Sequence, residues 1–230
     1  MSVQDSMFID RFYFLSKENE LDAILAGVTY SGGKKYKEGA LPFRVLPQRG
    51  IEILYLTGVT VITGSSDSPK AMMMKVMAAK LGIKNVEPIC RWRWVNDYLE
   101  MCFMKYTDFN NRKFKTVYVE GGRFAPNDPH IPRKGLVSCY EELFCEEALY
   151  ILEEPDWGMS LREQAELACL IHDCAKHSGM QFIISSSSPA LMSINGSTVY
   201  DLDEIPPVPR RWADARELKR TLTESIKGKS

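Results

Sequence analysis

Short apolar runs alternate with amphipathic segments from Gly58 onward. The run Val59–Thr63 is apolar, β-branched and bounded by glycines, which predicts a strand buried on both faces of a sheet. Ala148–Leu152, Gln181–Ser185 and Ser197–Leu202 have the same character. Strands of this kind, separated by helical patterns, predict an α/β fold with a mostly parallel sheet covered by helices on both faces.

Two helical patterns follow these strands. The segment Lys70–Gly82 is rich in helix formers; Pro69 suits a first helical position, and Gly82 suits a left-handed cap. Ser160 to Gly179 begins with a capping box of Ser160 and Glu163, which predicts a second helix. We expect its buried face to contain Leu161, Ala165, Ala168, Leu170, Ile171 and Cys174. The N-terminal third of the chain predicts edge strands and loops.

Composition places the chain among ordinary globular proteins. With 230 residues, 45% of them apolar and 26% charged, we expect a single domain over residues 1–230 whose positions 208–230 form a charged tail. The formal net charge of -1 lacks the positive field of non-specific nucleic-acid binding, so nucleic acid is not the expected partner. The absence of a signal peptide, a membrane-length apolar run and zinc-type cysteine spacing predicts a cytoplasmic protein with reduced thiols and no membrane span.

Candidate chemistry lies where the predicted strands end. In parallel sheets the working residues lie beyond the carboxyl ends of the strands. Those ends carry Gly64 to Lys70, Glu153 to Pro155 and Ser186 to Pro189. Gly64–Ala71 fails the P-loop pattern G-x-x-x-x-G-K-[ST] at two of its fixed positions. Taken alone, Lys70 is better explained as a helix-surface lysine, and the glutamates as a solvated strand end.

The order of the phrases raises the functional interpretation. LEEP at Leu152–Pro155, LIHDCAKHSG at Leu170–Gly179, QFIISSSSP at Gln181–Pro189 and VYDLD at Val199–Asp203 follow one another. In that order the chain resembles the small bacterial ABC/SMC-type ATPases of the AAA family. The resemblance is strong from about residue 149 to 203, moderate from 51 to 83 and weak from 84 to 136.

This resemblance implies a P-loop NTPase fold with an ABC-type antiparallel β subdomain near the N-terminus and a reduced helical insertion. It also implies that the strands ending in Thr63 and Leu152 are neighbours that open onto a shared crevice. Two hypotheses apply to the Arg91–Trp94 segment, RWRW. Stacking on nucleic acid is one, and strand packing with cation–π pairs is the favoured one.

The resemblance assigns the nucleotide-binding loop to Gly64, Ser65, Ser66, Asp67, Ser68, Pro69, Lys70, Ala71 and Met72. Lys70 matches the lysine that reaches the β- and γ-phosphates, and Gly64 matches the first glycine of the loop. Pro69 replaces the second glycine and removes a backbone N–H donor. Ala71 replaces the hydroxyl residue that binds magnesium, and a methyl group coordinates nothing.

The remaining roles fall on later residues. Glu153 stands at the Walker B aspartate and implies a Mg²⁺ ligand, while Glu154 matches the glutamate that activates the attacking water. Ser187 takes the position of the switch histidine. The ABC signature corresponds to Ser138, Tyr140 and Glu141, with Tyr140 in place of a glycine.

Several sensitive positions have therefore changed together, although phosphoryl transfer depends on the positioning that these groups provide. We expect a pseudo-ATPase that binds ATP and Mg²⁺ weakly or not at all and acts by association, as a head-to-tail homodimer or with a partner protein. The alternative is residual ATP hydrolysis by Lys70, Glu153 and Glu154. A third hypothesis, a nucleic-acid-associated module, predicts salt-sensitive DNA binding.

Overall fold

A computed structural model describes residues 7–25, 45–84, 86, 95–107, 114–122 and 135–212. Its centre is a five-stranded sheet in the order β5-β6-β7-β3-β8, in which each neighbouring pair is parallel. The strands are β3 (Val59–Thr63), β5 (Lys115–Glu120), β6 (Ala148–Glu153), β7 (Gln181–Ser185) and β8 (Thr198–Asp201). The predicted α/β fold with a parallel sheet is confirmed.

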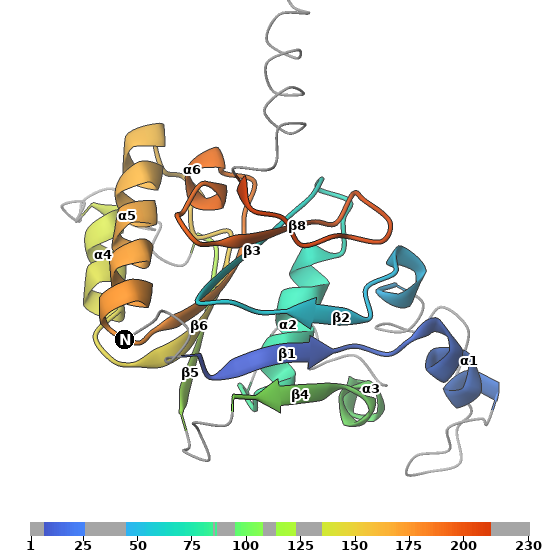
Figure 1. Cartoon of the computed structure of the whole chain (residues 1–230). Helices are drawn as coiled ribbons and strands as arrows, with labels where there is room; N and C mark the ends of the chain where they lie inside the picture. The colour runs from blue at the N-terminus through green and yellow to red at the C-terminus, as the bar shows by residue number, and fades with distance from the viewer. Residues whose placement is uncertain are drawn as a thin grey trace, which may run out of the picture.

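Helices α4 (Leu136–Leu143), α5 (Leu161–His177) and α6 (Pro189–Met192) cover one face of this sheet (Figure 1). Alternate strand residues such as Val61, Tyr150 and Phe182 turn toward them and form one of two apolar cores. The capping box predicted for Ser160 and Glu163 is present at the start of α5. It supplies partners for backbone N–H groups that the first turn of a helix leaves unpaired.

The opposite face carries helix α2 (Lys70–Lys80) and a small antiparallel sheet in front of it (Figure 1). This sheet has the order β2-β1-β4, with β1 at Ile9–Tyr13, β2 at Ile53–Tyr55 and β4 at Phe103–Tyr106. Helix α2 packs against β6 and β7, and its methionines fill the second core together with Phe12 and Leu54. Shorter elements complete this side: α1 (Lys17–Leu25), η2 (Pro47–Arg49) and α3 (Val95–Met101).

A buried glutamine joins the two sheets. The side-chain oxygen of Gln181, at the start of β7, accepts hydrogen bonds from the backbone N–H groups of Phe8 and Ile9 at 2.9 and 3.0 Å. Its Nε2 donates to the carbonyl oxygens of Ile9 and Thr57. Each polar atom of this amide therefore has protein partners, which offsets the cost of burying it.

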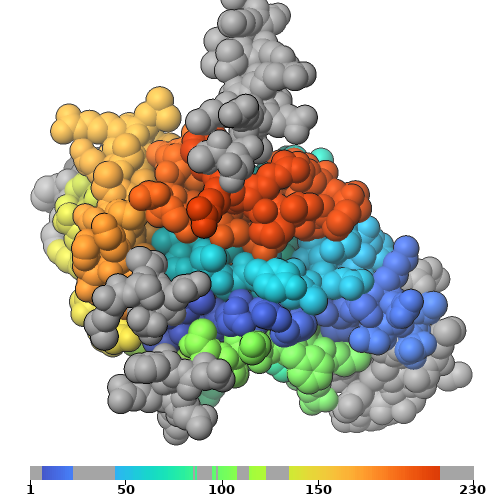
Figure 2. Space-filling model, viewed as in Figure 1, coloured from blue at the N-terminus to red at the C-terminus, as the bar shows by residue number. Residues whose placement is uncertain are grey.

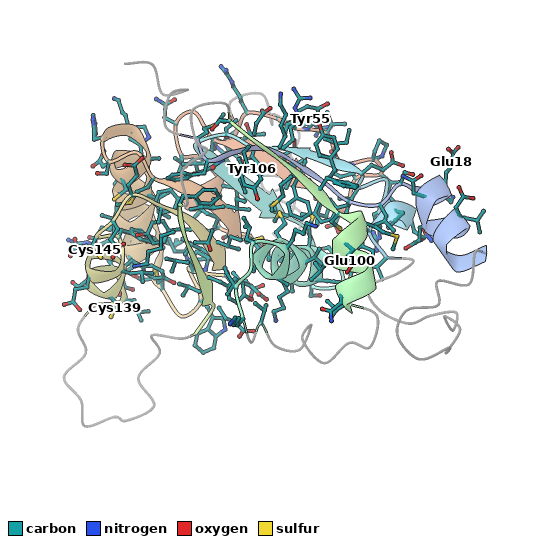
Figure 3. The ribbon with its side chains drawn as sticks, turned by 90° about the horizontal axis from the view of Figure 1, so that it is seen from below. Glu18, Tyr55, Glu100, Tyr106, Cys139 and Cys145 are labelled. Carbon is teal, nitrogen blue, oxygen red and sulfur yellow. The ribbon has the colours of Figure 1, made fainter. Side chains whose placement is uncertain are left out.

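The outer face of the antiparallel sheet is exposed. Figure 2 shows strands β2, β1 and β4 side by side at the surface. Because successive strand residues point to opposite faces, Leu54 is buried while Tyr55 is exposed. Tyr55 lies on the side away from α2 (Figure 3). An antiparallel element near the N-terminus was expected, but its third strand, β4, comes from the segment for which a helical insertion was predicted.

In the described part of residues 84–136, α3 is a helix of seven residues that is followed by β4 and β5, which is compatible with the expected reduced helical insertion. Two other expectations are corrected by the structure. Strands β3 and β6 are not immediate neighbours, because β7 lies between them. The buried face of α5 is formed by Leu167, Ala168, Ile171 and Ala175; Leu161 is 78% exposed, because it lies to one side of that row.

Arg91–Trp94 and the tail from residue 213 lie outside the described residues. Among the helices that the structure does describe, none has the length and apolar character needed to cross a bilayer.

Candidate functional site

The candidate site lies where the chain leaves the sheet in opposite directions. Helix α2 leaves β3 over one face, in contact with the core that contains Met73. Helix α6 leaves the adjacent β7 over the other face, where Leu191 is buried. In α/β proteins, ligands bind at the carboxyl ends of the strands beside such a switch point. The ends of β3, β6 and β7 meet here, although β3 and β6 are one strand apart.

The loop from Gly64 to Pro69 makes a tight turn between β3 and α2. Gly64 has φ of 144°, and a Cβ atom at this position would lie 2.8 Å from Ser68 Oγ, so the loop needs glycine here. The Ser68 hydroxyl donates to the Ser65 carbonyl at 2.8 Å, and the Ser68 N–H donates to the same oxygen. Ser66 and Asp67 are exposed at the tip of the loop.

An aspartate from the other end of the chain holds this loop in place. The two carboxylate oxygens of Asp203, after β8, accept hydrogen bonds from the N–H and the hydroxyl of Ser65, each at 2.8 Å. In the sequence, Asp203 stood out only as the last residue of the VYDLD phrase. Its position just beyond β8, the strand beside β3, was the available signal. The contact also occupies one loop N–H that could otherwise face an anion.

Lys70 is buried and points back into the loop. Its Nζ donates to the carbonyl oxygens of Gly64 and Ser65 at 3.1 and 3.0 Å. The same nitrogen lies 3.9 Å from Glu154 Oε1. The interpretation of Lys70 as a surface lysine is therefore wrong, and its ammonium group stands at the switch point, held by weak carbonyl ligands.

Helix α2 begins beside this ammonium group without a cap. Pro69 is its N-cap residue and makes no side-chain capping bond, so the expected first helical position is off by one. The N–H groups of Lys70, Ala71 and Met72 occupy the first turn, where an α-helix provides no internal partners. No acidic residue lies in that turn, which leaves the positive end of the helix dipole available to an anion.

Glu154 is held in an unusual backbone conformation. Its φ is 46°, a region that costs free energy for any residue with a side chain. The Glu154 N–H donates to the carbonyl oxygen of Ser185 at 2.8 Å, which fixes the turn after β6. The side chain is 51% exposed and directed at Lys70, so the carboxylate reaches the mouth of the loop.

Glu153, one residue earlier, is buried and points to the α2 side of the sheet. Tyr118 donates a hydrogen bond to its Oε2, and Lys75 Nζ lies 3.6 Å from its Oε1. Lys75 Nζ also lies 3.0 Å from Oε1 of Glu120, at the end of β5. Burial raises the pKa of Glu153, although the Tyr118 hydrogen bond and the Lys75 charge pull that pKa down. Burial is also the largest cause that raises the pKa of Tyr118.

Sequence reasoning missed Lys75, Tyr118 and Glu120. Lys75 was detectable as a lysine between Met74 and Val76 in an otherwise apolar stretch. Glu120 required knowledge of the pairing, since it is the register partner of Glu153 only because β5 lies beside β6.

The serine run divides into inward and outward residues. Ser186 donates to Asp156 Oδ1 at 2.7 Å and accepts from the N–H of Ser188. Ser188 donates to Gln164 Oε1 at 2.8 Å and caps α6. Ser187 is exposed. Its hydroxyl therefore lies at the surface of the switch-point edge, while its neighbours rigidify the turn.

The signature-like residues lie on α4 and face different ways. Tyr140 is buried, and its hydroxyl donates to the Pro155 carbonyl at 3.2 Å. Burial raises its pKa. Glu141 is exposed and Ser138 is partly exposed. Tyr140 therefore packs inside the α4 side of the molecule, and only Ser138 and Glu141 of this set are available to another molecule.

Magnesium fits these residues poorly. The Ala71 methyl group offers no lone pair, and each oxygen of Glu153 already has a partner in Tyr118 or Lys75. Within the described ranges, no cluster of three or more His, Cys, Asp or Glu side chains is suited to a metal ion. A phosphate group fits better, because Lys70 and the first turn of α2 provide positive charge and N–H donors.

The charge around the loop limits how tightly a phosphate can bind. Carboxylates outnumber ammonium groups: Lys70 and Lys75 stand among Asp67, Glu120, Glu153, Glu154, Asp156 and Asp203. These carboxylates would repel the negative charge of a triphosphate.

No protein-family model matches the chain, and a search of curated proteins finds no significant match.

Proposed function

We propose that this chain is a pseudo-ATPase of the P-loop type. Its Gly64–Met72 loop binds the phosphates of ATP weakly, it does not hydrolyse ATP efficiently, and it acts by association with another protein molecule. The ABC/SMC-type resemblance of the C-terminal phrases motivates the family part of this proposal.

The observation that carries the proposal is the position of Lys70. A buried ammonium group lies at the switch point of a parallel sheet, within a loop that leads into an uncapped helix. Its present ligands are two neutral carbonyl oxygens and a carboxylate at 3.9 Å. A phosphate oxygen is a stronger ligand for such a group than a carbonyl. The architecture thus suits an anion.

Hydrolysis requires more than an anion site. The groups that should position magnesium and water are an alanine methyl, a glutamate already bonded to Tyr118 and Lys75, and an exposed Ser187. Catalysis of phosphoryl transfer is mostly positioning and electrostatic stabilisation, so these substitutions remove what turnover needs.

Association is supported by apolar side chains near the same edge. Trp157 follows Glu154 by three residues and is 57% exposed, and Leu161 at the start of α5 is 78% exposed. Apolar side chains exposed near the loop are compatible with a protein contact at this edge. A second copy of this chain, placed head to tail so that Ser138 and Glu141 approach the loop, is the assembly that the resemblance implies.

Calorimetric titration with ATP and Mg²⁺, combined with a phosphate-release assay, tests the proposal. We expect a Kd of about 1 mM or weaker, which corresponds to roughly 4 kcal/mol, and no turnover. Lys70→Met should weaken the binding further, whereas the control Lys80→Met, at the other end of α2, should not. Micromolar affinity with turnover that Glu154→Gln abolishes would contradict the proposal.

Residual ATP hydrolysis is the second candidate, and the backbone of Glu154 favours it. A non-glycine residue at φ of 46° that directs a half-exposed carboxylate at a buried lysine has the kind of strain found at working sites. In this alternative Glu154 orients water, Lys70 holds phosphate and Glu153 contributes charge. The Glu154→Gln assay above separates the two candidates.

A further inference from the structure

Two glutamates lie side by side at the ends of β5 and β6. Glu120 and Glu153 are register partners in adjacent parallel strands, and both belong to the face that α2 covers. Like charges directly across a strand pair repel each other, and Glu153 has a side chain only 11% exposed. A positive charge between the two carboxylates relieves this repulsion, which solvent screens only in part because Glu120 alone is half exposed.

Lys75 supplies that charge from α2. Its Nζ lies 3.0 Å from Glu120 Oε1 and 3.6 Å from Glu153 Oε1, and its side chain is 10% exposed. Tyr118 lies two residues before Glu120, hence on the same face of β5, and its hydroxyl bonds the other oxygen of Glu153. One buried cation thus bridges two carboxylates, and the Tyr118 phenol donates to the other oxygen of Glu153.

We infer that Lys75 is the resident cation of the Glu120–Glu153 pair, in the place where a divalent metal ion would otherwise bind, and that phosphate binding by the Gly64–Met72 loop is therefore independent of metal. The first part concerns the protein by itself, and the second part rests on the proposed function.

The position of Lys75 in the helix explains why a metal ion does not compete well. Its neighbours Met74 and Val76 are fully buried, so the lysine stem is fixed in the core with only the ammonium group at the carboxylates. A divalent ion at Glu153 would have to displace that ammonium group, which sits on a side chain only 10% exposed. Otherwise the two positive charges would lie close together, which is strongly unfavourable in a poorly hydrated site.

Electron paramagnetic resonance of Mn²⁺ measures this directly in nucleotide-free protein, because bound Mn²⁺ loses the signal of the free ion. We expect the full wild-type chain and Lys75→Arg to bind Mn²⁺ no tighter than about 1 mM. Lys75→Met should bind one Mn²⁺ at least about tenfold tighter, because two facing carboxylates then lack a cation. The gain should disappear in Lys75→Met/Glu153→Gln and be absent from the control Lys80→Met.

Two results overturn the inference. One is wild-type Mn²⁺ binding as tight as that of Lys75→Met and abolished by Glu153→Gln, which would show that a metal displaces the lysine. The other is a folded Lys75→Met protein with no gain in affinity. Should Lys75→Met fail to fold by circular dichroism, Lys75→Gln provides the neutral variant, and the wild-type titration still decides.

Titration of the wild type with ATP in EDTA and in Mg²⁺ tests the second part. Affinities that agree within about twofold, below one RT of free energy, support metal independence, and binding seen only with Mg²⁺ contradicts it. Failure to bind ATP in either condition counts against the proposed phosphate site, whereas the Mn²⁺ titrations report on Lys75 regardless.

Discussion

Helices α2 and α5 start at the same edge of the parallel sheet, but their first turns differ. Helix α5 begins with a complete capping box of Ser160 and Glu163, which adds an acidic side chain at the positive end of the helix dipole. Helix α2 begins at Pro69 with no capping side chain and with Lys70 in its first turn, where a cation is unfavourable.

The difference separates stability from ligand binding. In α5 the capping box provides acceptors for the N–H groups of Ser160 and Glu163, and the Glu163 carboxylate already lies at the positive end of the helix. The first turn of α2 has no capping side chain for its N–H groups and contains the buried Lys70. An arrangement that stabilises the helix poorly but attracts an anion is expected at a binding site, where residues are often placed at a cost to stability.

Lys75→Met should have the largest effect on stability. Removing the lysine leaves Glu153 and Glu120 without their shared cation, and breaking a largely buried ion pair costs about 3 kcal/mol. Urea unfolding followed by circular dichroism measures the loss. The double variant Lys75→Met/Glu153→Gln should recover part of it. A loss below about 0.5 kcal/mol, the range of an exposed pair, would contradict the bridging role.

The same variant should show a distinct pH dependence. Burial raises the pKa of Glu153, so the folded state keeps a proton that the unfolded state releases, and this residue's contribution to stability falls as pH rises through the folded pKa. Without the Lys75 charge that pKa rises further. The stability deficit of Lys75→Met should therefore grow as pH rises above the ordinary pKa of a glutamate. A deficit that shrinks over this range would assign the effect to another group.

Ser160→Ala should show how much the capping box on α5 contributes to the free energy of unfolding. It removes the hydroxyl that accepts from the Glu163 N–H, and loss of such a cap costs about 1 kcal/mol. Thermal unfolding should report this loss while ATP binding stays unchanged. Altered ATP binding would mean that the two helix starts are coupled.

Glu154→Gly should stabilise the protein by about 0.5 to 1 kcal/mol, since glycine adopts a φ of 46° without the steric cost. The matched control is Glu154→Ala, which removes the carboxylate but keeps the Cβ atom. The alanine variant should gain nothing in the same urea experiment. Equal gains in both variants would point to charge repulsion instead of backbone strain.

Pro69→Ser should have the smallest effect. It adds a capping hydroxyl to α2, worth about 1 kcal/mol, and loses about half of that through a freer unfolded chain. A net gain near 0.5 kcal/mol is expected by chemical denaturation. Pro69→Ala, which has no hydroxyl, should lose a similar amount. A large loss in the serine variant would mean that the proline ring itself shapes the loop.

The sequence predicted the parallel strands well because their residues carry an unambiguous signal. Val59–Thr63 and Gln181–Ser185 match β3 and β7 residue for residue, since strands buried on both faces are continuously apolar. The antiparallel strands were not located. Their outward residues include Arg11, Tyr55 and Lys105, so the apolar alternation is short and diluted by polar and aromatic side chains.

The candidate site was predicted only in part, because its contacts join distant segments. The loop, Lys70 and the glutamates after β6 follow from local order along the chain. The Ser65–Asp203 bond spans 138 positions, and the Lys75–Glu120 bond depends on which strands are adjacent. A single sequence does not specify strand order. The contacts of Glu153 with Lys75 and Tyr118 could therefore not be predicted.

The central claim is that the Gly64–Met72 loop is where nucleotide phosphate binds, and that it binds weakly. Backbone amide NMR of the isotope-labelled chain during an ATP titration tests this most directly. The account predicts shift changes concentrated in this loop and the first turn of α2, with half-saturation at about 1 mM or above. Saturation at micromolar ATP, or shift changes that spare the loop, would contradict it.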